Sequence, residues 1–531
     1  FVTSNYSYIG DFQWNKGSDL LVGDSDISLG NSISNANQHN LNTSFDMRKL
    51  YRYLGIKKSS RRSRAPKSKD KTATSKASSK SKKFNLKNFG IGLLTSINRM
   101  QINYSEANSS FLPGYLPAPG FLGTLRPTAG YTFGSQRDIR RISAENGWLT
   151  TYDQFNQQYT ETHTQNIDFN INMEPISDLK IDLNGGKTYA TNLTETFNAV
   201  GNRYNQLIPN TFGNFNISTI LIKTAFSQSD EIKSVPFEAF KTNRLVIANR
   251  LAQNFYGANG FTTDSEGYPE GFGKNSQAVL LPSFLAAYSG NKSNKISLDA
   301  FRDIPLPNWN LKYTGFMKNK WFKKRFRRFS LTHGYNASYT INQFRSNLDY
   351  KAGANTLDQS DNYKAETLYS NINLVEQFSP LVKIDFEMKS SVKVSAEIKK
   401  DRSLSLSFDN NLLTEIHGNE YIFGLGYRIK DLKIRSKLAG PRRTIKSDLN
   451  MKADISMRNN KTIIRYLDLD NNQVSAGQTI WSMRYAADYA FSKNLTAIFY
   501  FDYAFSEYAI STAFPQTSIR SGFTLRYNFG N

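Results

Sequence analysis

The chain has 531 residues and no cysteine, and its 67 Lys and Arg outnumber 44 Asp and Glu to give a formal net charge of +23. The lack of cysteine excludes disulfides, thiolate metal sites and cysteine nucleophiles. Mean hydropathy is −0.52, and no stretch approaches the ~20 apolar residues of a membrane helix. Aromatic residues nevertheless make up 13% of the chain, which argues against disorder.

A transmembrane β-barrel reconciles low hydropathy with many aromatic residues, because each spanning strand is apolar on one face only. The sequence therefore predicts an all-β fold: part of a very large transmembrane antiparallel β-barrel with a small helical insertion. Since the chain starts at Phe1 without a basic and then apolar leader, we expect a mature or cut fragment of a longer exported protein.

The first predicted unit, residues 1–227, holds barrel strands with variable spacing. Period-two alternation or β-rich composition predicts strands over Tyr6–Trp14, Asn40–Met47, Ile91–Tyr104, Leu122–Phe133, Asn166–Met173, Leu179–Tyr189 and Phe215–Phe226. Phe111–Gly120 contains three prolines and is predicted to be a loop.

A basic, low-complexity run interrupts this unit. Ile56–Lys83 contains twelve Lys and Arg against Asp70 alone, about half of the net charge. No aromatic residue interrupts the run, which favours a solvated disordered loop; a nucleic-acid tail or a contact with anionic lipid is the alternative.

The second predicted unit, residues 228–295, has helical rather than strand-like spacing. Apolar residues of Pro236–Phe255 recur at helical intervals, with Pro236 suited to a first turn. Ala278–Tyr288 is a second candidate helix, broken at Pro282. We expect a cap or a plug-like element, followed by barrel strands over residues 296–531.

Aromatic and cationic residues are interleaved in Trp321–Phe329, after a predicted strand at Ile296–Phe301. On a strand, this pattern suits a membrane edge, with rings in the interface and cations at head groups or lipopolysaccharide phosphates. A nucleic acid or protein partner is the alternative.

The clearest alternation lies in the C-terminal 200 residues. Four stretches alternate with period two between a mainly apolar and a mainly polar face: Ile384–Ile398, Ile445–Met457, Trp481–Phe491 and Ile519–Phe529. Soluble strands usually have about 5–6 residues, whereas a tilted spanning strand needs about 9–11. Their length therefore favours membrane strands.

The same region predicts an alternation of short turns with long loops, as barrels place short turns in the periplasm and long loops outside. Short turns are predicted at Phe378–Pro380, Lys399–Arg402, Asn459–Lys461 and Ser492–Asn494. Long loops are predicted at Asp349–Asn362, Leu438–Thr444, Asp470–Gln478 and Ser506–Ser518.

The two faces of these strands give two sets of candidate residues. Polar alternates expected to face a wet lumen are Asp385, Glu387, Lys389, Lys393, Glu397, Asp448, Lys452, Asp454, Arg520 and Arg526. Residues expected to face lipid or the interface are Trp321, Phe322, Trp481, Tyr485, Phe499, Phe501, Phe523 and Phe529.

Nothing in the sequence predicts catalysis. The four histidines, His39, His163, His333 and His417, are far apart and lack the usual spacing of metal ligands. Paired carboxylates such as Asp385 and Glu387 lie beside lysines on strand faces. We therefore expect no enzyme activity, no cofactor and no metal.

Four motifs resemble a known family. Leu112–Phe121, Gly134–Arg140 with Glu145–Leu149, Glu174–Asp182 and Ile304–Gly315 are similar to the C-terminal part of the SprA (Sov) family, the outer-membrane translocons of the Bacteroidetes type 9 secretion system. The resemblance extends from about residue 85 to the end.

The resemblance implies a very large single-chain barrel in the cell outer membrane, whose pore passes folded cargo proteins. It also implies a lateral opening, a PorV-type partner barrel and a periplasmic plug protein, with this chain supplying part of the wall. Membrane lipid and lipopolysaccharide are the other expected partners, and nucleic acid is not. A nutrient transporter or porin, and a secreted adhesin or nucleic-acid-binding β protein, remain as alternatives.

Overall fold

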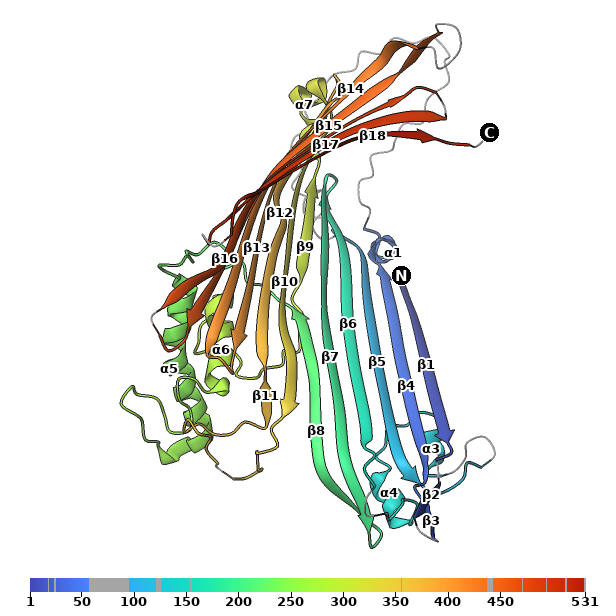
Figure 1. Cartoon of the computed structure of the whole chain (residues 1–531), viewed down its shortest axis with the longest axis vertical. Helices are drawn as coiled ribbons and strands as arrows, with labels where there is room; N and C mark the ends of the chain where they lie inside the picture. The colour runs from blue at the N-terminus through green and yellow to red at the C-terminus, as the bar shows by residue number, and fades with distance from the viewer. Residues whose placement is uncertain are drawn as a thin grey trace.

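Long two-faced strands dominate the chain and form an antiparallel sheet of 16 strands in the computed structural model (Figure 1). The structure describes residues 1–17, 19–22, 25–56, 95–120, 126–152, 155–354, 356–436, 443–469, 471–492, 494–510 and 513–529. The predicted basic loop at Ile56–Lys83 lies, beyond Ile56, outside the described residues.

The strands lie side by side almost in chain order. Along the sheet they are β1 (Val2–Asn15), β4 (Asn31–Asp46), β5 (Ile97–Tyr115), β6 (Tyr159–Ile176), β7 (Leu179–Val200), β8 (Arg203–Ser218), β10 (Phe326–Ser346), β12 (Asn371–Met388), β13 (Val392–Ser407), β14 (Leu412–Ser436), β15 (Arg443–Tyr466), β16 (Asn472–Ala490), β17 (Leu495–Tyr508) and β18 (Gln516–Tyr527). The short β11 (Thr367–Tyr369) pairs with β10, and β2 (Asp19–Val22) forms a separate hairpin with β3 (Ser25–Ser28). This confirms the predicted antiparallel all-β fold class with a helical insertion.

The sheet is open. β1 and β18 lie at the two ends of the strand order, and no ladder joins them within the described residues. The sheet also twists strongly, so that β14–β18 cross the direction of β1–β8 (Figure 1), as expected for a wide sheet of L-residues.

Each strand contributes alternately to two faces, because opposed residues in an antiparallel pair point to the same side. Ile398, Tyr421, Met457, Trp481 and Phe505 oppose one another in one continuous row across β13–β17. We call the side that carries this row the apolar face. The alternate residues form the polar face.

The two ends of the strands also differ. At one end, which we call the turn end, strands are joined by tight turns such as Ser177–Asp178 and residues 389–391. The opposite, loop end carries the long connections 116–158 and 347–366, although residues 201–202 and 408–411 connect strands tightly there. The connection of β4 to β5, residues 47–96, is long and starts and ends at the turn end. The predicted short turn at Ser492–Asn494 and the predicted long loops at Asp349–Asn362 and Ser506–Ser518 fit this arrangement.

Several predicted turns are wrong because the strands are longer than the membrane requires. Lys399–Arg402 lies inside β13, and Asn459–Lys461 lies inside β15. Phe378–Pro380 lies inside β12 at a shift in register, a place in a sheet that tolerates proline. Outside hydrocarbon, polar residues can continue a strand, so polarity alone does not mark a turn.

The reverse error occurs at Ile384–Ile398, which is a hairpin and not one strand. β12 ends at Met388 and β13 begins at Val392, with Ser391 at φ 70° in the turn between them. The predicted alternation continues through the turn, which hides it in the sequence.

Further corrections lie upstream. The C-terminal part of Leu122–Phe133 forms the short helix α3 (Ala129–Thr132), and β5 continues to Tyr115 through the predicted loop Phe111–Gly120. Pro113 is tolerated because its partner is Ser32 of β4, whereas pairing with β6 stops at Phe111.

A helical insertion interrupts a single strand position. β8 ends at Ser218, and β9 (Asn308–Tyr313) continues in line with it between the same neighbours, β7 and β10. The backbone of Leu306 donates to the carbonyl of Ser218 at 3.0 Å, which closes the base of the insertion. The predicted strands Phe215–Phe226 and Ile296–Phe301 are therefore wrong beyond Ser218.

The insertion contains both predicted helices. They are α5 (Val235–Tyr256), followed by the single turn η2 (Gly257–Asn259), and α6 (Gln277–Ser289), which includes Pro282 without ending there. Their apolar side chains, Phe240 and Phe284 among them, share one buried core with Tyr339 of β10 and Leu404 of β13. The insertion therefore covers the apolar face at the loop end and does not enter the polar face.

Three shorter helices, α3, α4 (Arg140–Glu145) and α7 (Lys320–Arg325), also pack on the apolar face. Tyr131 of α3 and Ala144 of α4 are buried against Ile33 and Leu112 on the apolar face. At the turn end, η3 (Gly315–Lys318) and α7 place Phe316 and Phe322 against Phe329 of β10. α1 (Met47–Tyr53) extends from the end of β4 beside the N-terminus (Figure 1).

Candidate functional site: the polar face of the sheet

The structure brings most of the predicted lumen residues onto one face. Asp385, Glu387, Lys393, Glu397, Asp448, Lys452, Asp454, Arg520 and Arg526 all belong to the polar face of β12, β13, β15 and β18. Lys389 lies in the turn after β12.

Charges on this face alternate in sign across neighbouring strands. Asp454 of β15 opposes Arg484 of β16, Arg484 opposes Asp502 of β17, and Asp502 opposes Arg520 of β18. Directly opposed unlike charges stabilise a ladder modestly. The positive and negative charges of this row therefore balance one another across the four strands.

Ion pairs continue this pattern towards β12. Lys383 pairs with Glu397 at 2.8 Å and Lys399 with Glu420 at 3.2 Å. Surface pairs of this kind contribute about 0–1 kcal/mol each, so they add little to stability. Because acids and bases pair with each other, few uncompensated charges remain in this part of the polar face.

Two glycines open a groove in the same region. Gly424 and Gly426 of β14 line a cavity of about 460 Å³ together with Lys393 and Lys452. A Cβ atom at Gly424 would lie 2.7 Å from a carboxylate oxygen of Asp454. Glycine is therefore needed for the charged neighbours to approach the strand.

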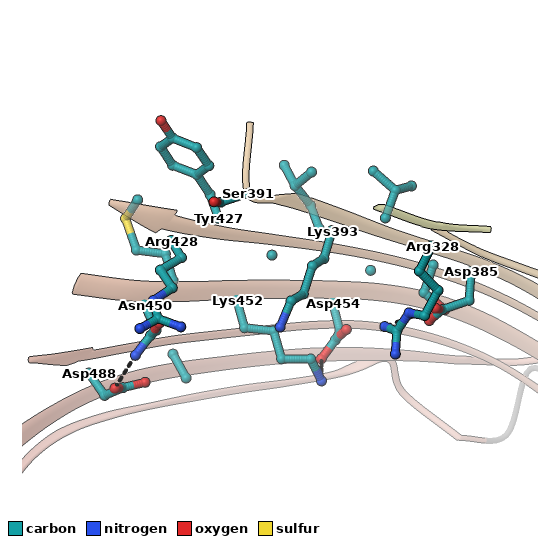
Figure 2. Close-up of a pocket in the computed structure, with 17 residues that line it drawn as sticks. Arg328, Asp385, Ser391, Lys393, Tyr427, Arg428, Asn450, Lys452, Asp454 and Asp488 are labelled. Carbon is teal, nitrogen blue, oxygen red and sulfur yellow. Dashed lines mark hydrogen bonds and ion pairs between the residues drawn. The ribbon is translucent and has the colours of Figure 1, made fainter. Parts of the chain in front are cut away.

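Figure 2 shows how the groove is populated. Arg328 of β10, Lys393 of β13, and Lys452 and Asp454 of β15 project over one shallow surface. Asn450 donates to Asp488 at 2.8 Å. Acids and bases are mixed, without the convergence on one point that a catalytic centre or a tight ligand site requires.

The predicted lipid-facing residues divide into two groups. Trp481, Tyr485, Phe499, Phe501 and Phe523 all lie on the apolar face. Phe529 follows the end of β18 and is 95% exposed.

Trp321 and Phe322 belong to the helix α7, and β10 begins only at Phe326, so the prediction of a strand over Trp321–Phe329 is wrong at its start. The side chain of Asn319 accepts from the backbone of Trp321 at 2.8 Å and caps this helix. The aromatic rings still gather on the apolar face.

Three buried ion pairs at the loop end were not predicted from the sequence. Glu415 pairs with Arg465 at 2.9 Å, and Glu376 pairs with Arg402 at 2.9 Å. Glu195 pairs with Arg140 of α4 at 2.8 Å. The sequence did contain a signal for these pairs. Each glutamate occupies an apolar-face position of its strand, and a charge at such a position needs a partner because hydrocarbon would exclude it.

The part of the chain that the structure describes contains neither a candidate metal site nor a candidate membrane-spanning helix. No three His, Cys, Asp or Glu side chains in these ranges gather in a way that could hold a metal. No helix within them is long and apolar enough to cross a membrane.

No protein-family model and no curated protein matches the chain. Among solved structures, it is similar to the RagAB peptide importer in its open-open state, at 8% identity and a TM-score of 0.26, over 96% of this chain and 49% of that one. A second RagAB peptide transporter structure gives 8% identity, a TM-score of 0.25, and coverage of 90% and 47%. The ferric-catecholate import receptor Fiu of E. coli K12 gives 8%, 0.23, 96% and 65%.

The chain thus spans about half the length of the two RagAB chains. At these TM-scores, the similarity carries no argument for fold or function. The fold assignment rests on the sheet itself.

Proposed function

We propose that this chain forms part of the wall of an outer-membrane channel, and that the channel conducts folded proteins as a secretion translocon. The apolar face would contact lipid and the polar face would line the water-filled passage. The protein would carry no catalytic centre and no cofactor.

The apolar face supports a membrane setting by its height. On β17, the apolar-face residues from Ala497 to Phe505 are uninterrupted. These nine residues match the ~9–11 that a tilted strand needs to cross the ~25 Å apolar band of outer-membrane barrels.

One observation favours a wide passage over a solute channel: the helices that cover the sheet pack on its apolar face. α3, α4, α5, α6 and α7 contact the apolar face, and none of the described residues folds over the polar face as a constriction or plug. A porin or nutrient transporter narrows its lumen from the polar side.

The open edges support a larger parent assembly. Unpaired backbone groups of β1 and β18 would cost several kcal/mol each in hydrocarbon, so further strands must pair with them. Fourteen strands follow one another in the sheet, so five or more additional ones would enclose a pore wider than that of the porins, which have 16–18 strands. The partners we propose are cargo proteins, a PorV-type barrel, a periplasmic plug protein and outer-membrane lipid, on the strength of the family resemblance.

Polymer exclusion in planar bilayers tests this function on the full-length parent protein. With its plug bound, the channel should be silent. Without the plug, it should admit polymers about 30 Å across, the diameter of a small domain. A pore that passes only small solutes at rest would overturn the proposal in favour of a porin or nutrient transporter.

A further inference from the structure

A cavity of about 660 Å³ lies where the helical insertion meets the apolar face. Aliphatic side chains form its walls: Ile217, Leu221, Leu285, Ile304, Leu306 and Leu374. Its cationic lining residues are Lys223, Lys292, Lys295 and Arg302. We propose that this cavity binds a phosphorylated, acylated glycolipid of the outer leaflet, namely the lipid A portion of lipopolysaccharide. The inference rests on the proposed function, and it takes the loop end as the outer side because outer-membrane barrels place their long loops outside.

The cavity lies at the height where the outer leaflet should end. Its wall residue Ile217 opposes Lys187 of β7, and Lys187 follows Leu179, at the turn end, by eight residues. These nine residues are about the 9–11 that a tilted strand needs to cross an apolar band. Lipid phosphates would lie just above that level, beside the cationic lining.

The four cations are available to an anion. Lys223 donates to the carbonyl of Gly290 at 3.4 Å and to the side chain of Asn291 at 3.1 Å, and Arg302 donates to the carbonyl of Ser297 at 3.2 Å. No ion pair joins Lys223, Lys292, Lys295 or Arg302 to a carboxylate among the described residues. Asp299, an acidic neighbour of Arg302, accepts a hydrogen bond from Ser297.

Apolar side chains beside these cations are left open. Ile304 is 77% exposed and Leu306 is 42% exposed, although both line the cavity. An acyl chain along the wall would cover the aliphatic groups while its phosphates meet the lysines.

Lipid A fits the charge distribution better than a glycerophospholipid. The cations come from separate segments, at Lys223, at Lys292 with Lys295, and at Arg302, so they can meet more than one phosphate. Lipid A carries two phosphates on a disaccharide, whereas phosphatidylglycerol carries one.

The test measures lipid binding to the full-length parent protein in nanodiscs by native mass spectrometry. The probes are bisphosphorylated lipid A, monophosphoryl lipid A and phosphatidylglycerol. The variant K292Q/K295Q removes two cations that can donate charge-assisted hydrogen bonds to phosphate, so it should weaken binding of bisphosphorylated lipid A about tenfold or more. Its binding of phosphatidylglycerol should stay unchanged.

A matched variant, K180Q/K312Q, removes the same charge from the polar face of β7 and β9 at the turn end, where the two lysines oppose each other. It should leave lipid A binding unchanged, and equal losses in both variants would show general charge attraction and overturn the site. Equal affinity of the wild type for lipid A and phosphatidylglycerol would also overturn it. A wild type that forms a wide pore but shows no such preference would refute only this inference, since the conductance test judges the channel separately.

Discussion

Three carboxylates on the apolar face lie against arginines at the loop end, where they join the caps to the sheet. Glu415 and Arg465 are both fully buried, and Glu415 also accepts hydrogen bonds from Ser229 at 2.7 Å and from Tyr288. Ser229 and Tyr288 belong to the insertion. A buried pair adds little net stability over apolar residues, but removal of one partner leaves an uncompensated charge.

Arg465→Met should therefore destabilise the protein by about 3–5 kcal/mol, and the double variant with Glu415→Leu should recover most of the loss. Urea unfolding followed by heat-modifiable migration in detergent gels measures this. Lys461→Gln is the control, because it breaks the partly exposed pair of Lys461, also on β15, with Glu231 of the insertion and should leave the urea midpoint nearly unchanged. Similar losses in both single variants would contradict the special role of burial.

Docking of α4 should depend on pH. Burial alone would raise the pKa of Asp138, but hydrogen bonds from the side chain and backbone of Arg140 hold this pKa below its ordinary value. A lowered pKa in the folded state gives stability that is present above the unfolded pKa of about 3.9 and is lost as the pH falls through the folded pKa. Hydrogen exchange in residues 139–149, corrected for intrinsic rates, should therefore accelerate below about pH 4. Asp138→Asn should weaken this dependence, and an unchanged transition in that variant would refute the assignment.

At the scale of elements, period-two alternation identified strands but not their ends. Trp481–Phe491 and Ile445–Met457 lie within β16 and β15 except for Phe491, because hydrocarbon on one side and water on the other enforce strict alternation. Beyond the band, helices replace lipid as the cover, and the sequence loses that constraint. The turn at residues 389–391 was not predicted, because Lys389 and Ser391 occupy polar positions of the same period-two alternation.

The insertion shows what helical spacing can and cannot predict. Both helices were evident from the apolar spacing, but their docking face was not, since contacts such as Phe284 with the strand residues are nonlocal. The two polar-face and apolar-face sets were largely predictable in β12–β18, whereas the buried arginine pairs required knowledge of register.

Phe284→Ala should loosen the insertion, because Phe284 is fully buried between α5 and the sheet. Loss of a buried phenylalanine costs about 3–5 kcal/mol. Limited proteolysis within residues 257–276 should become faster. Phe514→Ala serves as the control, as Phe514 is 86% exposed, and equal acceleration in both variants would contradict the proposed packing.

At the scale of the whole molecule, we expect lipid to contact the apolar face of the sheet and water to contact its polar face. Phe501 lies on the apolar face near the middle of the band, and its neighbour Tyr500 lies on the polar face. Phe501→Arg should cost about 2–4 kcal/mol when the protein folds into a bilayer, whereas Tyr500→Arg should be tolerated. Folding yields into liposomes compare the two, and similar yields would argue against lipid contact.

Single cysteines, introduced into a chain that has none, test directly whether lipid contacts one face of β17 and water the other. Cysteines at Ala497, Phe499 and Phe501 should resist a membrane-impermeant maleimide in intact outer membranes and respond to a lipid-soluble quencher. Cysteines at Thr496, Ile498 and Tyr500 should show the opposite, giving a period of two along β17. Uniform labelling at all six positions, or labelling of the apolar face alone, would contradict a wall between lipid and a water-filled passage.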